Sequence, residues 1–342
     1  MISILVCSAN MSIVAAIFLI ISRVLRERQS PMISYYSWLV VMIGFLIPLR
    51  PQTGAAVVTV NNPSDLYGSG MAASVNPMSV ITAVYLIGAM CYVVYLIIRN
   101  TIWNRTVMRF ARSVPETISN MTLEIADSLE IRKHVEVYFA DIITSPMMTG
   151  LVNPIILLPK REYGYDELRL IIKHELIHYK HHDLWIKLLL IICRIIHWFN
   201  PLMIVIGKKL EQECEYYCDM TVTAGEDTEM RKIYCESILN TVSATKTLTF
   251  GRITPAIATN FYSPKQGLKH RLQLILTNSK RLFIGSLVAV VLLTCISGFA
   301  IASPGSASGE GYDVDTSHIK YRGSEEDSEP TVSSQYYEAN TV

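Results

Sequence analysis

Four long apolar runs predict that the chain crosses a membrane. A helix that spans the hydrocarbon core needs about 20 mainly apolar residues. Residues 2–21, 34–49, 78–98 and 283–302 approach or reach this length. The first run has no basic start and is followed by arginines, which argues against a cleavable signal peptide. The pattern therefore predicts three N-terminal spans within residues 1–99 and a final span near the end of the chain.

The placement of Lys and Arg predicts how these spans are oriented, because cytoplasmic loops carry an excess of basic residues. Basic clusters follow the first and the third run, whereas residues 51–76 contain no Lys or Arg. We therefore expect the N-terminus outside, residues 100–280 in the cytoplasm and residues 303–342 outside. Arg50, at the outer end of the second run, is the one basic residue that does not fit. The two clusters are Arg23, Arg26 and Arg28, and Arg99, Arg105, Arg109 and Arg112.

A further apolar stretch, residues 185–207, is interrupted by Lys187, Arg194, His197 and the pair Asn200-Pro201. Its first arm has about 15 residues and a helical length of about 20 Å, which is short for a core of about 30 Å. The two halves of the candidate metal site described below flank this stretch, and one ion cannot be bound from both sides of a bilayer. We therefore expect a helical hairpin that dips into the inner leaflet, rather than a complete span.

The composition agrees with a membrane protein. Hydrophobic residues make up 51% of the chain and charged residues 17%, whereas soluble domains carry about 25% charged residues. The seven cysteines are scattered, so no disulfide scaffold is expected. The net charge of +1 averages over uneven segments, and we expect no direct nucleic-acid binding. Residues 303–342 are polar and acidic, which is typical of a disordered tail.

The strongest chemical signal is His174-Glu175-Leu176-Ile177-His178, within a segment predicted to be helical from residue 166 to 182. Histidines four residues apart lie on one helix face, one turn apart, so both rings can reach one Zn²⁺. Glu175 can then act as general base toward the attacking water. The alternative interpretation is a pair of surface histidines beside the basic residues 180–182.

A second helical segment can complete a metal site. Catalytic zinc usually has three protein ligands and an open position. Glu215 and Asp219 are four apart and share a face, so one can bind zinc while the other accepts the second ring proton of a ligand histidine. Glu211 shares this face and is a rival ligand. Cys214 and Cys218 could supply thiolates, although a closed centre of that kind would leave the glutamate of the first motif without a use.

The ordered set of these elements resembles the integral-membrane zinc metallopeptidases of the BlaR/MecR type, the receptor-peptidases of β-lactam resistance. The resemblance covers about residues 1–303. Its elements are the three N-terminal spans, Gly150–Pro159, His174–Asp183, His197–Pro201, Glu215–Asp219 and the final span.

This resemblance implies an α-helical integral membrane protein with a cytoplasmic α+β zincin-like (gluzincin) metallopeptidase domain. It implies one catalytic Zn²⁺, with Glu215 as third ligand beside the two histidines, and Asp219 as the carboxylate that supports a ligand histidine. It leaves the oxyanion-stabilising group unplaced, with Tyr217, His181 and His182 as candidates. The strand expected at the edge of the sheet, where a substrate peptide adds as a further strand, comprises Pro154, Ile155, Ile156, Leu157 and Leu158.

The family also implies a location and a substrate. The protein would lie in the plasma membrane and cleave a cytoplasmic protein, such as a winged-helix transcriptional repressor, or itself. Residues 249–263 lack periodicity and are a candidate loop for self-cleavage. The spans permit a homodimer without requiring one.

One departure from the family changes the expected signal. The β-lactam receptors carry a large external penicillin-binding domain after the last span, whereas residues 304–342 are few and polar here. Ser317 and Lys320 match the Ser-x-x-Lys spacing of an acylated serine, but so short a tail would not build the pocket that this serine needs. We therefore do not expect direct acylation by β-lactams.

Two other functions remain open on the sequence. A zinc protease of membrane-protein quality control or prenyl-protein processing uses a similar pair of motifs, usually with more and longer spans. A non-catalytic membrane scaffold would signal by binding a partner, although every residue type needed for catalysis is present.

Overall fold

The computed structural model describes residues 2–24, 29–47, 77–247 and 265–277. All described residues belong to one compact unit, Met1–Pro304. The expected final span, the stretch of residues 51–76 without Lys or Arg, the acidic tail and the candidate self-cleavage loop lie outside the described residues.

Each of the three N-terminal apolar runs forms a helix: α1 (Ile2–Val24), α2 (Pro31–Leu46) and α3 (Pro77–Phe110). Within the described residues, two helices are long and apolar enough to span a membrane, over Ile4–Val24 and Pro77–Phe110, and α2 is a shorter apolar helix. The third helix continues well beyond the expected end of its span at residue 98, so Arg99, Arg105 and Arg109 of the basic cluster lie on the same helix and Arg112 follows it. Apolar side chains along α3 are mostly exposed, as they would be in contact with lipid.

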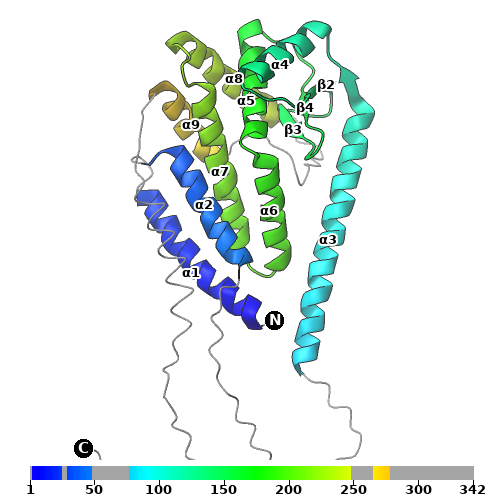
Figure 1. Cartoon of the computed structure of the whole chain (residues 1–342), viewed down its shortest axis with the longest axis vertical. Coiled ribbons are helices and arrows are strands. Elements are labelled where there is room, and N and C mark those ends of the chain that lie inside the picture. The colour runs from blue at the N-terminus through cyan, green and yellow to red at the C-terminus, as the bar shows by residue number, and fades with distance from the viewer. Residues whose placement is uncertain (1, 25–28, 48–76, 248–264, 278–342) are drawn as a thin grey trace, which may run out of the picture. The chain divides into compact units, whose positions relative to one another are not determined.

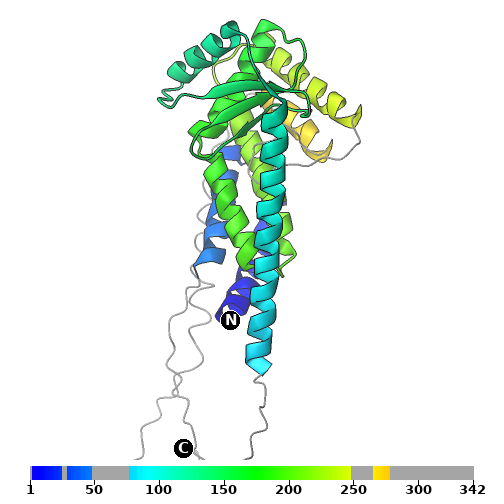
Figure 2. The ribbon, with the colours of Figure 1, turned by 90° about the vertical axis from the view of Figure 1, so that its right-hand side faces the viewer.

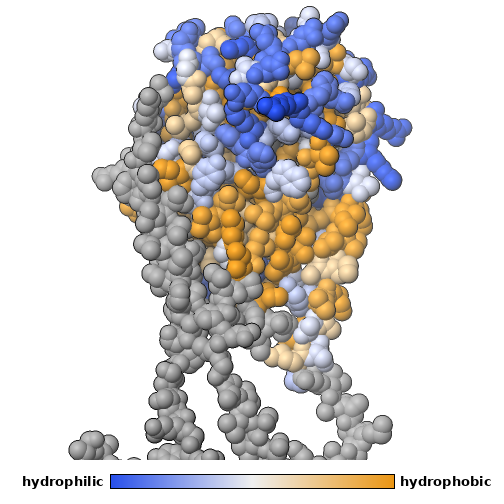
Figure 3. Space-filling view, viewed as in Figure 1, coloured by the Kyte–Doolittle hydropathy of each residue, from blue (hydrophilic) through white to orange (hydrophobic). Residues whose placement is uncertain are grey.

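The surface of the described residues separates by polarity. Polar side chains gather over the part that holds the sheet, α4 and α5, and a broad apolar band lies below them (Figure 3). The described helices below the sheet therefore present the kind of surface that a bilayer covers.

The interrupted apolar stretch forms two packed helices, α6 (Asp183–Ile196) and α7 (Leu202–Val222), joined by a short turn (Figure 1). Fourteen residues in α6 give a helix of about 21 Å. A hairpin is therefore present where the sequence predicted one; its position in a membrane stays a prediction.

The polar residues at the hairpin turn bond to the N-terminal helices. Nε2 of His197 lies 3.0 Å from the carbonyl oxygen of Phe45 in α2. The side-chain amide of Asn200 donates to the hydroxyl oxygens of Ser8 and Ser12 in α1, at 2.8 Å each. Because polar groups in an apolar environment need partners, these bonds explain why polar residues interrupt an otherwise apolar stretch, and they attach the turn to α1 and α2.

A small mixed sheet of four strands follows α3 along the chain, with strand order β1-β2-β4-β3. The pairs β1–β2 and β3–β4 are antiparallel, and β2–β4 is parallel. The strands are β1 (Ala111–Ser113), β2 (Glu136–Ala140), β3 (Met147–Thr149) and β4 (Ile155–Leu158).

The expectation that Pro154, Ile155, Ile156, Leu157 and Leu158 form the edge of the sheet is wrong. In β4, Ile155, Ile156 and Leu157 pair with β2 on one side and with β3 on the other. A strand with neighbours on both sides has no free ladder of backbone groups for a substrate. The side chains of Ile156, Leu157 and Leu158 are fully buried, so β4 is a core strand, and the edges of this sheet are β1 and β3.

Helix α5 (Tyr165–Lys180) lies at the centre of the packing (Figure 2). It contacts α4 (Glu116–Ser128) and β3 on one side, and α6, α7 and α8 (Thr228–Thr247) on others. The last described helix, α9 (Lys265–Thr277), packs on α7 and α8. Because the inner face of α5 is covered by these elements, the polar side chains of His174, Glu175 and His178 on it are removed from water.

Candidate metal centre

The histidine motif lies in the second half of α5. Acidic residues in the first turn, Asp166 and Glu167, favour the start of this helix by interacting with its dipole. His174, Glu175 and His178 have no exposed area. The Nε2 atoms of the two histidines are 3.0 Å apart, which excludes the interpretation as a pair of surface histidines.

Helix α7 brings Glu215 to the same place. Its carboxylate oxygens lie 3.7 Å from Nε2 of His174 and 3.6 Å from Nε2 of His178. The three side chains offer ligand atoms within 4.8 Å of one another, and all three are buried. The rival ligand Glu211 is exposed and does not belong to this group.

The direct partner of His178 is Asp183. Oδ2 of Asp183 lies 2.6 Å from Nδ1 of His178, and Oδ1 accepts a hydrogen bond of 2.6 Å from the hydroxyl of Tyr35 in α2. Burial would raise the pKa of Asp183, but His178 and Tyr35 outweigh it and hold this pKa at about 2. An ionised carboxylate only accepts hydrogen bonds, so Nδ1 of His178 carries the proton. When the ring is neutral, Nε2 therefore presents its lone pair to the centre.

The backbone explains how Asp183 reaches a histidine on the preceding helix. α5 ends at His181, and His182 has a positive φ of 60°, a left-handed conformation that is uncommon outside glycine. This single residue breaks the helix, and α6 begins at Asp183, just beyond the end of α5 (Figure 1).

His174 is supported by a longer chain of hydrogen bonds. The hydroxyl of Tyr234 in α8 lies 2.7 Å from Nδ1 of His174 and 2.7 Å from Oδ1 of Asp219. Burial keeps the pKa of Tyr234 well above its usual range, so it has one proton to donate. The carboxylate of Asp219 accepts the hydrogen bond from the Tyr234 hydroxyl. Nδ1 of His174 must therefore donate its own hydrogen bond to the phenol oxygen. When this ring is neutral, Nε2 of His174 therefore also presents its lone pair, and it lies 3.7 Å from Oε2 of Glu215.

Asp219 therefore supports a ligand-type histidine indirectly. Its Oδ1 is 3.5 Å from Nδ1 of His174, and Tyr234 bridges the two. The sequence suggested a direct bond from this carboxylate, whereas the direct bond is made by Asp183 to the other histidine.

Arg271 of α9 completes the charge balance of the centre. Its guanidinium binds Asp219 through two bonds of 2.6 and 2.7 Å, and its NH1 lies 3.3 Å from Oε2 of Glu215. Burial would raise the pKa of Glu215, but His174 and Arg271 hold it at about 2. The centre therefore holds four buried carboxyl groups, those of Glu175, Asp183, Glu215 and Asp219, beside the one buried guanidinium of Arg271. This excess of acidic groups suits a divalent cation.

The residues therefore fit a metal ion. Two imidazole nitrogens and a carboxylate converge, and their other polar atoms are bonded so that the lone pairs face inward. Oε2 of Glu215 is buried and accepts no hydrogen bond from the described residues. Two nitrogens and one carboxylate are a ligand set that zinc adopts in catalytic sites.

The comparisons with known proteins agree with this geometry. A family model described as BlaR1 peptidase M56 matches residues 3–275. A regulatory protein BlaR1 from Bacillus licheniformis is 36% identical over 118 residues, which is 33% of this chain and 20% of that protein. A methicillin resistance mecR1 protein from Staphylococcus aureus is 27% identical over 257 residues, which is 66% of this chain and 43% of that protein. The chain thus spans less than half the length of these relatives. It belongs to the BlaR1 peptidase M56 family.

Proposed function

We propose that the chain is a membrane-embedded zinc endopeptidase with a zincin-like catalytic domain, and that its active site faces the cytoplasm. The observation that carries this proposal is the convergence of His174, His178 and Glu215, with Glu175 next to the first histidine on α5. A zinc ion held by these three residues would act as a Lewis acid toward the scissile carbonyl and the attacking water.

The protein side chains supply the proton transfers. Glu175 is fully buried on the same helix as the two histidines, where its carboxylate accepts a proton from the attacking water and passes it to the leaving amine. Asp183 and Tyr234 hold the two rings in the tautomer that leaves Nε2 bare. Arg271 pairs with Asp219 and helps to hold the pKa of Glu215 low.

Strand β3 is the edge strand that we propose for substrate binding. It lies at one end of the sheet and contacts α5, the helix that carries the candidate active site. A substrate segment that pairs with Met147–Thr149 in extended form would run beside that helix. This proposal replaces the assignment of β4.

We propose a regulatory role for the cleavage. The relatives are named as a regulatory protein and a methicillin resistance protein, which supports a substrate in gene regulation. The substrate would be a cytoplasmic protein, such as a winged-helix repressor, or the chain itself.

Zinc content and proteolysis of the purified, detergent-solubilised chain test this function. We expect about one zinc per chain, with cleavage of an unfolded model protein that stops when a chelator removes the metal and returns when zinc is restored. Glu215→Ala should lose zinc and activity, because it removes one of three ligands. Glu211→Ala is the matched control, since Glu211 lies one turn earlier on α7 and is exposed. A native chain that binds no zinc would overturn the proposal.

Asp183→Asn is expected to weaken zinc binding by roughly 10- to 100-fold, the usual effect of losing a partner of a ligand histidine. Asp183 accepts from both His178 and Tyr35, but Asn offers one acceptor oxygen, and its amide would face one of these donors. Competition with a chromophoric zinc chelator measures the affinity.

Adding Tyr35→Phe to the Asp183→Asn chain should recover part of the lost affinity, because it removes one of the two donors. Equal affinities in the native and Asp183→Asn chains would show that the hydrogen bond to His178 does not support metal binding.

A further inference from the structure

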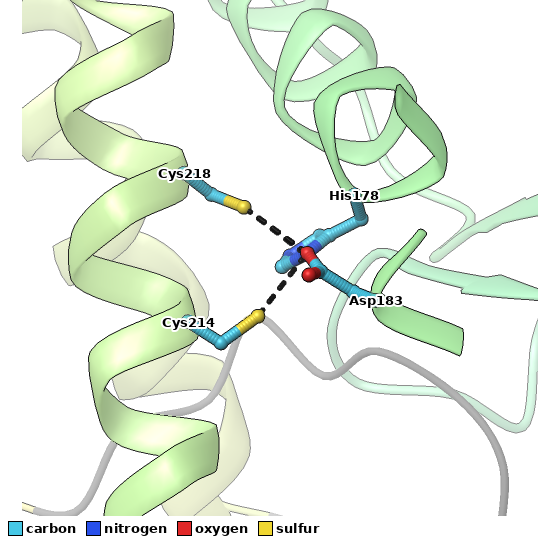
Figure 4. A group of neighbouring side chains, drawn as sticks. All are labelled: His178, Asp183, Cys214 and Cys218. Carbon is cyan, nitrogen blue, oxygen red and sulfur yellow. Dashed lines mark hydrogen bonds and ion pairs between the residues drawn. The ribbon is translucent and has the colours of Figure 1, made fainter. Parts of the chain in front are cut away.

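A second group of metal-binding side chains lies against the opposite edge of the His178 ring. Nδ1 of His178, a carboxylate oxygen of Asp183 and the sulfurs of Cys214 and Cys218 lie within 4.8 Å of one another, and all four residues are buried. Figure 4 shows the two cysteines, one turn apart on α7, directed toward the histidine and the aspartate. His178 therefore separates two clusters, with Nε2 facing Glu215 and Nδ1 facing the thiols.

The spacing of these atoms is close to that of a tetrahedral metal site. Zinc bonds of about 2.0–2.3 Å in tetrahedral geometry place neighbouring ligand atoms about 3.3–3.8 Å apart. Sγ of Cys218 lies 3.2 Å from Nδ1 of His178 and 3.4 Å from Oδ2 of Asp183. Sγ of Cys214 lies 3.8 Å from the same nitrogen. The hydrogen-bonded pair of His178 and Asp183, at 2.6 Å, would have to open.

We propose that Cys214, Cys218, Asp183 and Nδ1 of His178 form a second site for a thiophilic divalent cation, Zn²⁺ or Cd²⁺, and that its occupancy inhibits the peptidase. Thiolate, imidazole and carboxylate are together a donor set for such ions. The four residues come from α5, α6 and α7, so the fold and not one local motif assembles the site. This second site is not the closed centre of two cysteines and two histidines considered from the sequence, because His174 belongs to the cluster with Glu215.

Inhibition follows from the shared ring, and this part of the inference rests on the proposed function. Metal ligands must be deprotonated, so binding releases the two thiol protons and the Nδ1 proton of His178. The cation then takes the place of the hydrogen bond from His178 to Asp183 that fixes the ring for the catalytic centre. Loss of that bond alters a ligand of the first site, and we expect turnover to fall.

Titration with Cd²⁺ tests the site independently of catalysis. The full chain, in detergent and with a phosphine reductant, is expected to develop the ultraviolet charge-transfer band of cadmium bound to thiolate. The double variant Cys214→Ser/Cys218→Ser should lose the band, with affinity reduced by more than the roughly 10- to 100-fold effect of an outer-shell change. Cys235→Ser is the matched control, because Cys235 is buried on α8 and does not belong to the cluster.

Proteolysis measured with excess Zn²⁺ tests the inhibition. Each variant is compared with its own rate at one zinc per chain. The native chain and Cys235→Ser should lose activity as zinc rises, and the double variant should resist. If the double variant does not fold, the single variant Cys214→Ser, which removes one of four ligands, should weaken both the band and the inhibition.

The outcomes separate the two proposals. A charge-transfer band that is absent from the native chain, or that persists in the double variant, overturns the second site. Inhibition by excess Zn²⁺ that is equally strong in the native chain and in the double variant overturns its regulatory role. If the native chain shows the band without any proteolysis, the second site stands and the proposed peptidase function fails.

Discussion

Glu175→Gln is expected to abolish proteolysis while zinc content stays at the native level. A general base contributes about 10²- to 10⁴-fold to the rate, and glutamine has nearly the same shape as glutamate but does not accept the proton. Glu175 is not among the three side chains that converge on the candidate metal position, so the metal has no reason to leave. Metal analysis and the cleavage rate, measured on one preparation, separate the two effects.

Asp166→Asn is a suitable control for this variant, because Asp166 lies on the same helix and is exposed. It should retain the native rate. Cleavage by the Glu175→Gln chain would mean that another group acts as the base, and loss of zinc would mean that Glu175 helps to hold the metal. The Glu175→Gln variant also tests self-cleavage. If its fragment pattern is the same as that of the native chain, the chain does not cut itself.

Local spacing explains why the core of the candidate site could be predicted. His174 and His178 share a face of any helix, and so do Glu215 and Asp219, because both pairs are four residues apart. The structure places the first pair and Glu215 together. The sequence left Glu211 as an alternative, since it lies on the same side of α7, and only packing showed that it is exposed.

The supporting residues come from distant parts of the chain, and no local pattern indicated them. Tyr35 is 148 residues from Asp183, and Arg271 is 52 residues from Asp219. Tyr234 lies on another helix, where a single tyrosine in an amphipathic pattern is indistinguishable from a core residue. Asp183 was visible as the end of a family motif, but its role depends on the left-handed turn at His182.

The same limit explains the error over the substrate strand. The apolar run of β4 identifies a buried strand, but it does not state which strands lie beside it. The neighbours of β4 are fixed by β2, which begins 19 residues before it, and by the short strand β3. Strand order is a property of tertiary packing, so an edge strand could not be read from this run alone.

Arg271→Met is expected to lower the stability of the folded chain by about 3–5 kcal/mol, the usual cost of removing one partner of a buried ion pair. This is a large part of a total that is typically about 5–15 kcal/mol. Arg271 has no exposed area, pairs with Asp219 through two bonds and lies beside Glu215. Without Arg271, the buried carboxylates of Glu215 and Asp219 repel each other with no cation between them. The ion pairs from α9 to these two residues of the candidate metal centre are also lost.

Thermal unfolding in detergent, followed by tryptophan fluorescence with and without zinc, measures this effect. The loss should persist in the metal-free chain, because the ion pairs do not depend on the metal. Adding Asp219→Asn should restore much of the stability, since it removes the carboxylate left without its partner. Arg169→Met is the control: Arg169 makes a partly exposed pair with Glu226 at 3.7 Å, and such pairs contribute about 0–1 kcal/mol. Equal unfolding temperatures for Arg271→Met and Arg169→Met would show that the buried charge of Arg271 neither holds α9 in place nor stabilises the candidate metal centre.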